Sequence, residues 1–191
     1  MMGIKTKIQN IVLSVKYKDT EFNLNKVVRS LDGARYDPEL FPGIAYKSEH
    51  VSFLIFASGK MICVGAKRME DARQEIKKLT RKLRKAHIKV KYDLKVEVQN
   101  IVASVDFGRK FDIERIARRF ENTEYNPEVF PGLVFRLDDP KAAVLLFGSG
   151  KGVCAGVKSM RDIKRAVQKT NKILTGIKTP PSKKKRFLGR F

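Results

Sequence analysis

FLIFASGKMICVG, the stretch Phe53–Gly65, recurs about 90 residues later as VLLFGSGKGVCAG, the stretch Val144–Gly156. In each copy a run rich in apolar residues meets a Ser-Gly-Lys turn and then resumes. Such runs on both sides of a short turn are typical of two antiparallel strands joined by a hairpin. The chain is therefore predicted to be a tandem repeat in which each hairpin belongs to a larger sheet.

The composition indicates a globular protein with an anionic partner. The chain has 191 residues, and its apolar fraction of 42% is enough for a buried core. A formal charge of +21 favours binding to nucleic acid or to an anionic membrane surface, although solubility alone is the simpler alternative. No apolar run has the length of a membrane span and the first residues lack the apolar core of a signal peptide, so we expect an intracellular protein without a membrane partner.

Few residues suggest catalysis or metal binding. Cys63 and Cys154 occupy equivalent places inside predicted strands, so each is expected to pack in the core of its own half, without a disulfide or a metal. His50 and His87 fall in a loop and at a helix end, with no metal-ligand spacing around them. Because no glycine-rich phosphate loop is found either, the sequence predicts a protein that is not an enzyme and uses no cofactor.

The elements follow the same order in both copies: strand, short helix, antiparallel strands, long helix. Asn23 and Asp112 precede apolar residues at helical spacing and are predicted N-caps. YDPELFPG and YNPEVFPG, each with two prolines and a glycine, predict fixed turns before the hairpins. Two later segments carry apolar stripes typical of long helices: Met69, Ala72, Ile76, Leu79 and Leu83, and Met160, Ile163, Val167, Thr170 and Leu174.

This order predicts an α+β fold with two structural repeats in one antiparallel sheet and all helices on one side. Residues 1–91 are assigned to the first repeat with its connecting segment, and residues 92–176 to the second. The linker at residues 86–91 has no Pro, Gly or Ser cluster, which argues against two independent units. Residues 177–191 include two prolines and many basic side chains, and are predicted to be a disordered basic tail.

The face of the sheet opposite the helices, called the underside below, is predicted to be apolar. If Ile55 and Cys63 point toward the helices, their neighbours along each strand point away. These neighbours are Leu54, Phe56, Ile62 and Val64, with Leu145, Phe147, Val153 and Ala155 in the second copy. A contiguous exposed apolar face marks an interaction site. With Asn10 and Asn100 near its middle and lysines at its edges, it suits the minor groove of A·T-rich DNA.

Four doubled motifs resemble those of the TATA-box-binding protein family. They are QNIVxSV, Y(D/N)PExFPG, LxFxSGK and GxK, in the same order in both copies between Ile8 and about Gly176. The resemblance implies a saddle-shaped, curved sheet of ten antiparallel strands, with four helices on its convex side and an underside that grips the minor groove of a TATA element. This family is itself the standard example of a protein that kinks DNA by wedging side chains between base steps.

The resemblance also implies roles for individual residues. The intercalating side chains are expected to be Phe41 with Phe56, and Phe130 with Phe147. Two central hydrogen-bonding residues and an apolar floor are expected at the base edges: Asn10, Asn100, Val12, Val102, Leu54, Leu145, Ile62 and Val153. Polar and basic residues are expected to position the DNA backbone: Lys47, Arg136, Ser58, Ser149, Lys60, Lys151, Lys67 and Lys158. Val64 and Ala155 stand at the base edges where the family usually has threonine, so two hydrogen bonds there are expected to be missing.

The family pattern also suggests protein partners. The loop at residues 126–129 matches the surface that recruits transcription factor B, with Glu128 and Val129 as contacts, and RNA polymerase would follow through that factor. Dimerisation of the free protein through its underside is left open. An archaeal-type protein, cytoplasmic and associated with the nucleoid, is expected, although a eukaryotic nuclear protein fits the motifs nearly as well.

Two alternatives concern the positive charge. Residues 67–91 carry eleven basic and three acidic residues, mostly on a helix predicted to face away from the TATA groove. This charge is either a solvated helix face or a surface for an acidic partner or for non-specific DNA contacts. A separate alternative for the whole protein is a non-specific architectural DNA-bending or chromatin protein that uses the same saddle and the basic tail. A substrate-gripping domain of a nucleic-acid enzyme is a further possibility, but the chain has no room for a catalytic domain.

Overall fold

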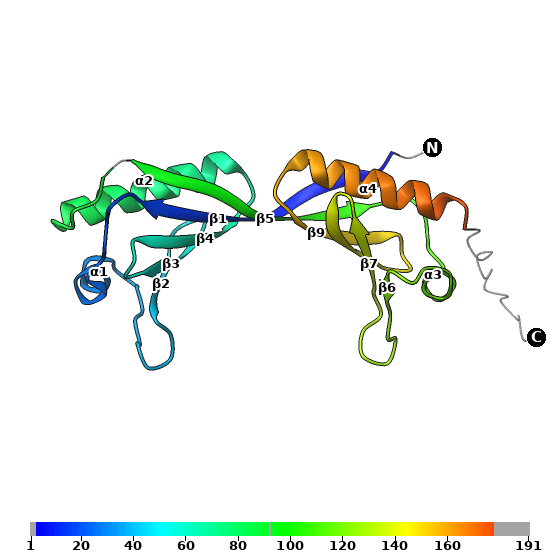
Figure 1. Ribbon diagram of the computed structural model, residues 1–191, viewed down its shortest axis with the longest axis horizontal. Helices are drawn as coiled ribbons and strands as arrows, with labels where there is room; N and C mark the ends of the chain where they lie inside the picture. The colour runs from blue at the N-terminus through cyan, green and yellow to red at the C-terminus, as the bar shows by residue number, and fades with distance from the viewer. Residues whose placement is uncertain (1–2, 92, 178–191) are drawn as a thin grey trace, which may run out of the picture.

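The computed structural model describes residues 3–91 and 93–177, and it shows a curved antiparallel sheet with helices packed on one side (Figure 1). Within these residues the sheet has nine strands in the order β2-β3-β4-β1-β5-β9-β8-β7-β6. The strands are β1 (Lys5–Tyr17), β2 (Gly43–Lys47), β3 (Ser52–Phe56), β4 (Lys60–Ala66), β5 (Leu94–Asp106), β6 (Thr123–Glu124), β7 (Leu133–Asp138), β8 (Lys141–Leu146) and β9 (Lys151–Val157). The predicted basic tail at residues 177–191 lies, apart from Ile177, outside the described residues.

The predicted number of ten strands is wrong by one. In the second repeat, β6 pairs with β7 through two residues. In the first repeat the corresponding segment forms a single bridge, in which Arg35 and Ala45 exchange two backbone hydrogen bonds of 2.9 Å. The chain arrives there directly from a turn at Gly33, with φ +75. One pair is therefore all that this segment forms.

The two repeats join at the centre through β1 and β5. These strands pair antiparallel along their whole length, from Lys5 opposite Asp106 to Tyr17 opposite Leu94. Each also pairs on its other side with the last strand of one repeat, β1 with β4 and β5 with β9. The prediction that both repeats share one continuous sheet is confirmed.

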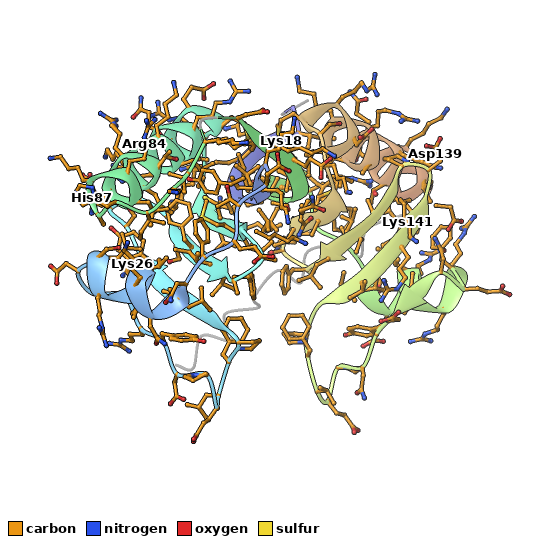
Figure 2. The ribbon with its side chains drawn as sticks, turned by 60° about the vertical axis from the view of Figure 1, so that its left-hand side comes forward. Lys18, Lys26, Arg84, His87, Asp139 and Lys141 are labelled. Atoms are coloured by element: carbon orange, nitrogen blue, oxygen red, sulfur yellow. The ribbon has the colours of Figure 1, made fainter. Side chains whose placement is uncertain are left out.

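Four helices of the described residues pack on the same side of the sheet. Helices α2 (Met69–Lys85) and α4 (Met160–Thr175) lie across its top, whereas α1 (Leu24–Ser30) and α3 (Ile113–Arg119) lie at its two outer ends (Figure 1). The two short helices begin as predicted, because Asn23 and Asp112 each accept a backbone hydrogen bond of 3.1 Å. Figure 2 shows Lys26 of α1 below Arg84 and His87 at the end of α2, and the Lys26 ammonium donates to the His87 carbonyl at 3.4 Å.

Each repeat has its own hydrophobic core between the sheet and its helices. Cys63 lies in the first core and Cys154 in the second, both without exposed surface. Burial raises the pKa of the Cys63 thiol to about 12, with a smaller contribution from the Glu75 charge, and raises the pKa of Cys154 to about 11. Both thiols are therefore protonated and act as small core side chains, as predicted. Within the described residues no helix has the length and apolarity needed to cross a bilayer.

Candidate nucleic-acid interface

The sheet presents two chemically distinct faces. Ile55 and Cys63 point into the core and are fully buried. Their neighbours Leu54, Ile62 and Val64 are half-buried on the underside, and the same alternation holds for Leu145, Val153 and Ala155. Val12 and Val102, on the two central strands, are half-buried as well. The underside is thus an apolar surface with no helix over it, as the alternation of residues predicted.

Two asparagine side chains near the middle of the underside are held by the backbone of the adjacent strand. The Asn10 side-chain oxygen accepts a hydrogen bond from Gly65 N–H at 2.7 Å, and that of Asn100 accepts from Gly156 N–H at 2.9 Å. A backbone N–H can only donate, so each amide must turn its oxygen to the glycine and its NH₂ group outward. Among the described residues nothing accepts from these NH₂ groups. The underside therefore has two outward-facing donors.

These two contacts occur where the sheet is irregular. The pairing of β1 with β4, and that of β5 with β9, shifts register close to the asparagine. Gly65 and Gly156 have φ values of +102 and +88, in the region that favours glycine. An extra residue at such a bulge leaves an N–H without a partner in the strand ladder, and here the asparagine oxygen takes that N–H.

Two pairs of phenylalanine rings mark the ends of the underside. Phe41 and Phe56 pack edge to face with ring centroids 5.7 Å apart, and Phe130 and Phe147 do the same at 5.9 Å. Phe41 is 39% exposed and Phe130 is 45% exposed, which is unusual for large apolar side chains. The four residues predicted as intercalating side chains are thus brought together in two pairs, one in each repeat.

A glycine lies against each ring pair. A Cβ atom on Gly43 would lie 2.9 Å from Phe41 and 3.0 Å from Phe56. On Gly132 it would lie 2.6 Å from Phe130 and 3.0 Å from Phe147. These glycines leave space for the rings, a role that the sequence analysis did not assign to them. The repeated Pro-Gly after each of Phe41 and Phe130 is the sequence signal that could have indicated it.

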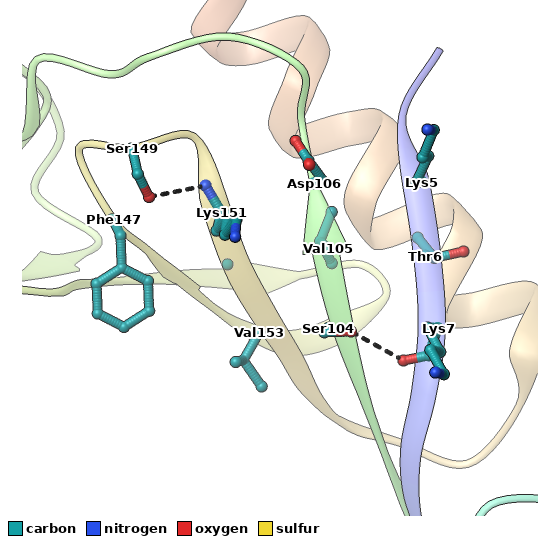
Figure 3. A pocket seen from close by; sticks show the side chains of 11 residues that line it. Lys5, Thr6, Lys7, Ser104, Val105, Asp106, Phe147, Ser149, Lys151 and Val153 are labelled. Atoms are coloured by element: carbon teal, nitrogen blue, oxygen red, sulfur yellow. Dashed lines mark hydrogen bonds between the residues drawn. The ribbon is translucent and has the colours of Figure 1, made fainter. Parts of the chain in front are cut away.

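An open hollow of about 770 Å³ lies at the edge of the underside, where β1 of the first repeat and strands β5 and β9 of the second repeat meet (Figure 3). Phe147 and Val153 point the same way there, and Lys5, Lys7 and Lys151 bring positive charge to it. The hollow combines apolar surface with cations, the combination that a DNA groove between two phosphate strands requires.

The residues predicted to contact the DNA backbone are all exposed: Lys47, Ser58, Lys60, Lys67, Arg136, Ser149, Lys151 and Lys158. Arg136 differs from the others because its guanidinium pairs with Glu124 at 2.6 Å. A hydrogen bond from Arg136 also holds the pKa of the Glu124 carboxyl below its usual value, and the Arg136 charge adds to this. Arg136 thus already has an anionic partner in the free protein, which the sequence analysis did not foresee.

The two turns before the hairpins project away from α2 and α4 (Figure 1). They share one geometry, since Asp37 accepts from Glu39 N–H at 3.1 Å and Asn126 accepts from Glu128 N–H at 3.2 Å. At the tips, Leu40 is 84% exposed and Val129 is 80% exposed. The predicted partner contacts Glu128 and Val129 thus lie at the exposed tip of the second turn, and the first turn presents similar chemistry.

One cluster of potential metal ligands contains Glu49, His50 and Glu75, whose ligand atoms lie within 4.8 Å of one another. The Lys78 ammonium contacts Glu75 at 2.7 Å and Glu49 at 3.2 Å. Lys78 therefore supplies the positive charge between these carboxylates, and the cluster is better described as an ion-pair network than as a metal site.

Two repeats in one curved sheet, with helices above and an apolar underside below, define the class of saddle-shaped DNA-binding proteins. The family model described as "Transcription factor TFIID (or TATA-binding protein, TBP)" matches residues 5–86 and 95–177. The chain therefore belongs to the TATA-binding protein family.

Archaeal proteins are similar over most of the chain. The TATA-box-binding protein of Methanocaldococcus jannaschii is 46% identical over 171 residues, which cover 88% of this chain and 93% of that protein. The one from Methanothermobacter thermautotrophicus is 44% identical over 172 residues, covering 89% and 94%. The solved structure of the Methanococcus jannaschii protein superposes with a TM-score of 0.84 at 45% identity, covering 89% of this chain and 98% of that one.

Family membership makes the chain an archaeal-type DNA-binding protein of transcription initiation that acts at the TATA box. The family consists of transcription factors and is not a family of enzymes.

Proposed function

We propose that the protein binds the minor groove of a TATA element with its underside, bends the DNA sharply, and recruits transcription factor B and, through it, RNA polymerase. The observation that carries this proposal is the placement of two phenylalanine pairs at the ends of an apolar face with two amide donors near its centre. No other surface of the described residues combines these three features.

Recognition begins at the base edges. The minor groove of A·T pairs presents acceptors only, so the outward NH₂ groups of Asn10 and Asn100 find partners there. The half-buried valine, leucine and isoleucine side chains of the underside contact the rest of the groove floor and exclude water. Each guanine adds a minor-groove amino group against this largely apolar floor, so a G·C-rich groove is disfavoured.

Bending follows from the phenylalanine pairs. Wedges that enter base steps unstack them and open the minor groove, as is well described for this family. Smooth bending of a short duplex costs on the order of 1–6 kcal/mol. Burial of the apolar underside against the opened groove offsets this cost. Exposed lysines such as Lys60 and Lys151 then hold the phosphates on both sides.

The bent complex leaves the turn at Asn126–Val129 free, because this turn projects from the outer end of its repeat (Figure 1). Val129 offers an exposed apolar contact, and Glu128 offers a carboxylate beside it. We assign this tip to transcription factor B. Glu128→Lys with Val129→Ala should abolish the ternary complex on TATA DNA and leave binding to the DNA alone unchanged.

End-labelled FRET on a TATA duplex and a scrambled duplex, titrated at two salt concentrations, tests binding and bending together. The proposal predicts a high-FRET complex with TATA DNA alone, still formed at the higher salt. Phe56→Ala and Phe147→Ala should each reduce the FRET change sharply while the fold, checked by circular dichroism, is kept. Unchanged bending in both variants would show that these phenylalanines do not act as wedges between base steps.

The charge of +21 supports a second candidate, a non-specific architectural DNA-binding protein that uses the same saddle. In that case both duplexes would bind alike, stay straight and dissociate together as the salt concentration rises.

A further inference from the structure

The two halves of the underside differ in the side chains that lie beside their asparagines. Val64 immediately precedes Gly65, whose N–H holds Asn10, and Ala155 immediately precedes Gly156, whose N–H holds Asn100. Across the hairpins, Val64 lies opposite Ser52 and Ala155 lies opposite Ala143. All four side chains are half-buried. The surface beside Asn100 is thus built from two alanines, whereas the surface beside Asn10 carries a valine.

This difference has the size of a chemical group that distinguishes base pairs. In the minor groove, G·C differs from A·T by the amino group on guanine C2, which is about as large as a methyl group. Valine carries two methyl groups that alanine lacks. Compared with the surface beside Asn10, the surface beside Asn100 therefore leaves additional free space, about the volume that such an amino group needs.

The hydrogen-bonding groups nearby are the same in both halves of the underside. The Asn100 oxygen accepts one hydrogen bond, from Gly156 N–H, and an amide oxygen has two lone pairs. The Asn10 oxygen has the same capacity, but the residue before its glycine is the larger Val64. Steric access, not hydrogen-bonding capacity, separates the two sites.

We propose that the half of the underside around Ala155 accepts a minor-groove amino group, whereas the half around Val64 excludes one. The preferred element is then asymmetric about its centre, and this asymmetry gives a nearly symmetric saddle a preferred direction on the DNA. The inference rests on the proposed function, because it takes the underside to face the minor groove.

The test uses a self-complementary A·T element in which chosen adenines are replaced by 2,6-diaminopurine. This base still pairs with thymine but adds the minor-groove amino group. For each adenine position near the centre, two modified elements are made. One carries the modification on a single arm of the element, and the other carries it on both symmetry-related arms. Binding is measured by fluorescence anisotropy, and bending by FRET.

The losses of affinity caused by the first and the second amino group are expected not to be equal. A protein on a symmetric element can turn to place a single amino group over Ala155, so the first group should weaken binding only about twofold, by the loss of one of two orientations. The second group must then meet Val64 and should weaken binding roughly tenfold or more. Equal costs for the first and second groups at every position would overturn the inference.

Two single substitutions provide matched controls. Val64→Ala should let the doubly modified element bind almost as well as the unmodified one. Ala155→Val should make even one amino group cost roughly tenfold, because neither orientation then avoids a valine. If neither variant changes the pattern, the assignment to these residues is wrong. If the unmodified element is itself neither bound nor bent, the proposed function fails. This outcome differs from equal costs of the two amino groups and from an unchanged pattern in the two variants, which count only against the inference.

Discussion

The side-chain oxygen of Asn100 accepts a hydrogen bond at 2.9 Å from the backbone N–H of Gly156, which lies 56 residues further along the chain. Asn10 makes the equivalent bond with Gly65 at 2.7 Å. A side chain that is free to rotate could present either its oxygen or its NH₂ group to a ligand. These backbone contacts remove that choice, and the two residues become fixed donors suited to a groove lined with acceptors.

Replacing Asn100 by Asp should keep the hydrogen bond from Gly156 N–H but remove the NH₂ group that faces the base edges. The Asn100→Asp carboxylate can still accept from Gly156 N–H, so the fold should be kept, but its second oxygen would face the acceptors of the base edges. We expect affinity for TATA DNA, measured by anisotropy, to fall roughly tenfold or more. Asn126→Asp is the matched control for the added charge, because Asp37 stands at the corresponding place in the first repeat. Equal losses in the two variants would mean that charge alone explains the effect.

Gly132→Ala should disturb the wedge without touching the wedge residues. Its Cβ would lie 2.6 Å from the Phe130 ring and 2.9 Å from Leu145 Cδ1, so the ring pair must shift. We expect a smaller FRET change on TATA DNA and a loss of about 1–3 kcal/mol in the free energy of unfolding. Gly176→Ala serves as control, since its Cβ would meet nothing within 4 Å. Wild-type bending by the Gly132 variant would show that the position of the rings is unimportant.

The salt dependence of binding can locate the phosphate contacts. Lys151 lies at the edge of the underside, whereas Arg81 is exposed on α2, on the opposite side of the sheet. Lys151→Gln should reduce the slope of log K against log salt concentration by about one, because one counterion fewer is released. Arg81→Gln should leave the slope for TATA DNA unchanged. A reduced slope for Arg81→Gln would favour the view that the basic helix face also contacts DNA.

Glu75 predicts a pH-dependent contribution to stability. Its side chain is 1% exposed, and although burial by itself raises the pKa, hydrogen bonds from Lys78 and Ser48 outweigh this and lower it below the ordinary value of 4.5. A carboxyl whose pKa is lower in the folded state stabilises that state above its unfolded pKa and loses this effect as the pH falls through the folded pKa. Glu75→Gln should therefore differ most from wild type near pH 7.

Urea unfolding at several pH values measures this difference. We expect Glu75→Gln to lose about 1–3 kcal/mol at pH 7, and the gap to wild type to narrow below pH ~4. Lys172→Gln, on the exposed face of α4, is the control for a surface charge change. A gap that stays constant from pH 7 to pH ~3 would show that packing, and not the carboxylate charge, is responsible.

Much of the fold could be predicted from the sequence because each local sequence pattern occurs in both repeats. The alternation along the strand correctly predicted that Ile55 faces the core and Leu54 faces the underside. Asn23 and Asp112 cap their helices as expected. The number of strands could not be predicted, because a single extra backbone pair distinguishes the Arg35–Ala45 bridge from a strand.

The finer features of the site depend on approaches through space between distant residues. Nothing near Asn10 in the sequence indicates that its oxygen will be taken by Gly65, because that contact depends on the register shift between two strands. The pairing of Arg136 with Glu124 likewise arises only when β6 lies beside β7. Sequence patterns predict which face a residue occupies, but the free or occupied state of its polar atoms is decided by its neighbours in space.

In the proposed function, the underside reads a DNA minor groove. Replacing every A·T pair of the TATA element by inosine·cytosine tests it most directly, because this change keeps the minor-groove edges of A·T and converts the major-groove edges to those of G·C. The proposed function predicts that the substituted duplex is bound and bent like the original in the FRET titration, whereas the matching G·C duplex is not. If the inosine·cytosine duplex fails as the G·C duplex does, the protein does not recognise its element through the minor groove.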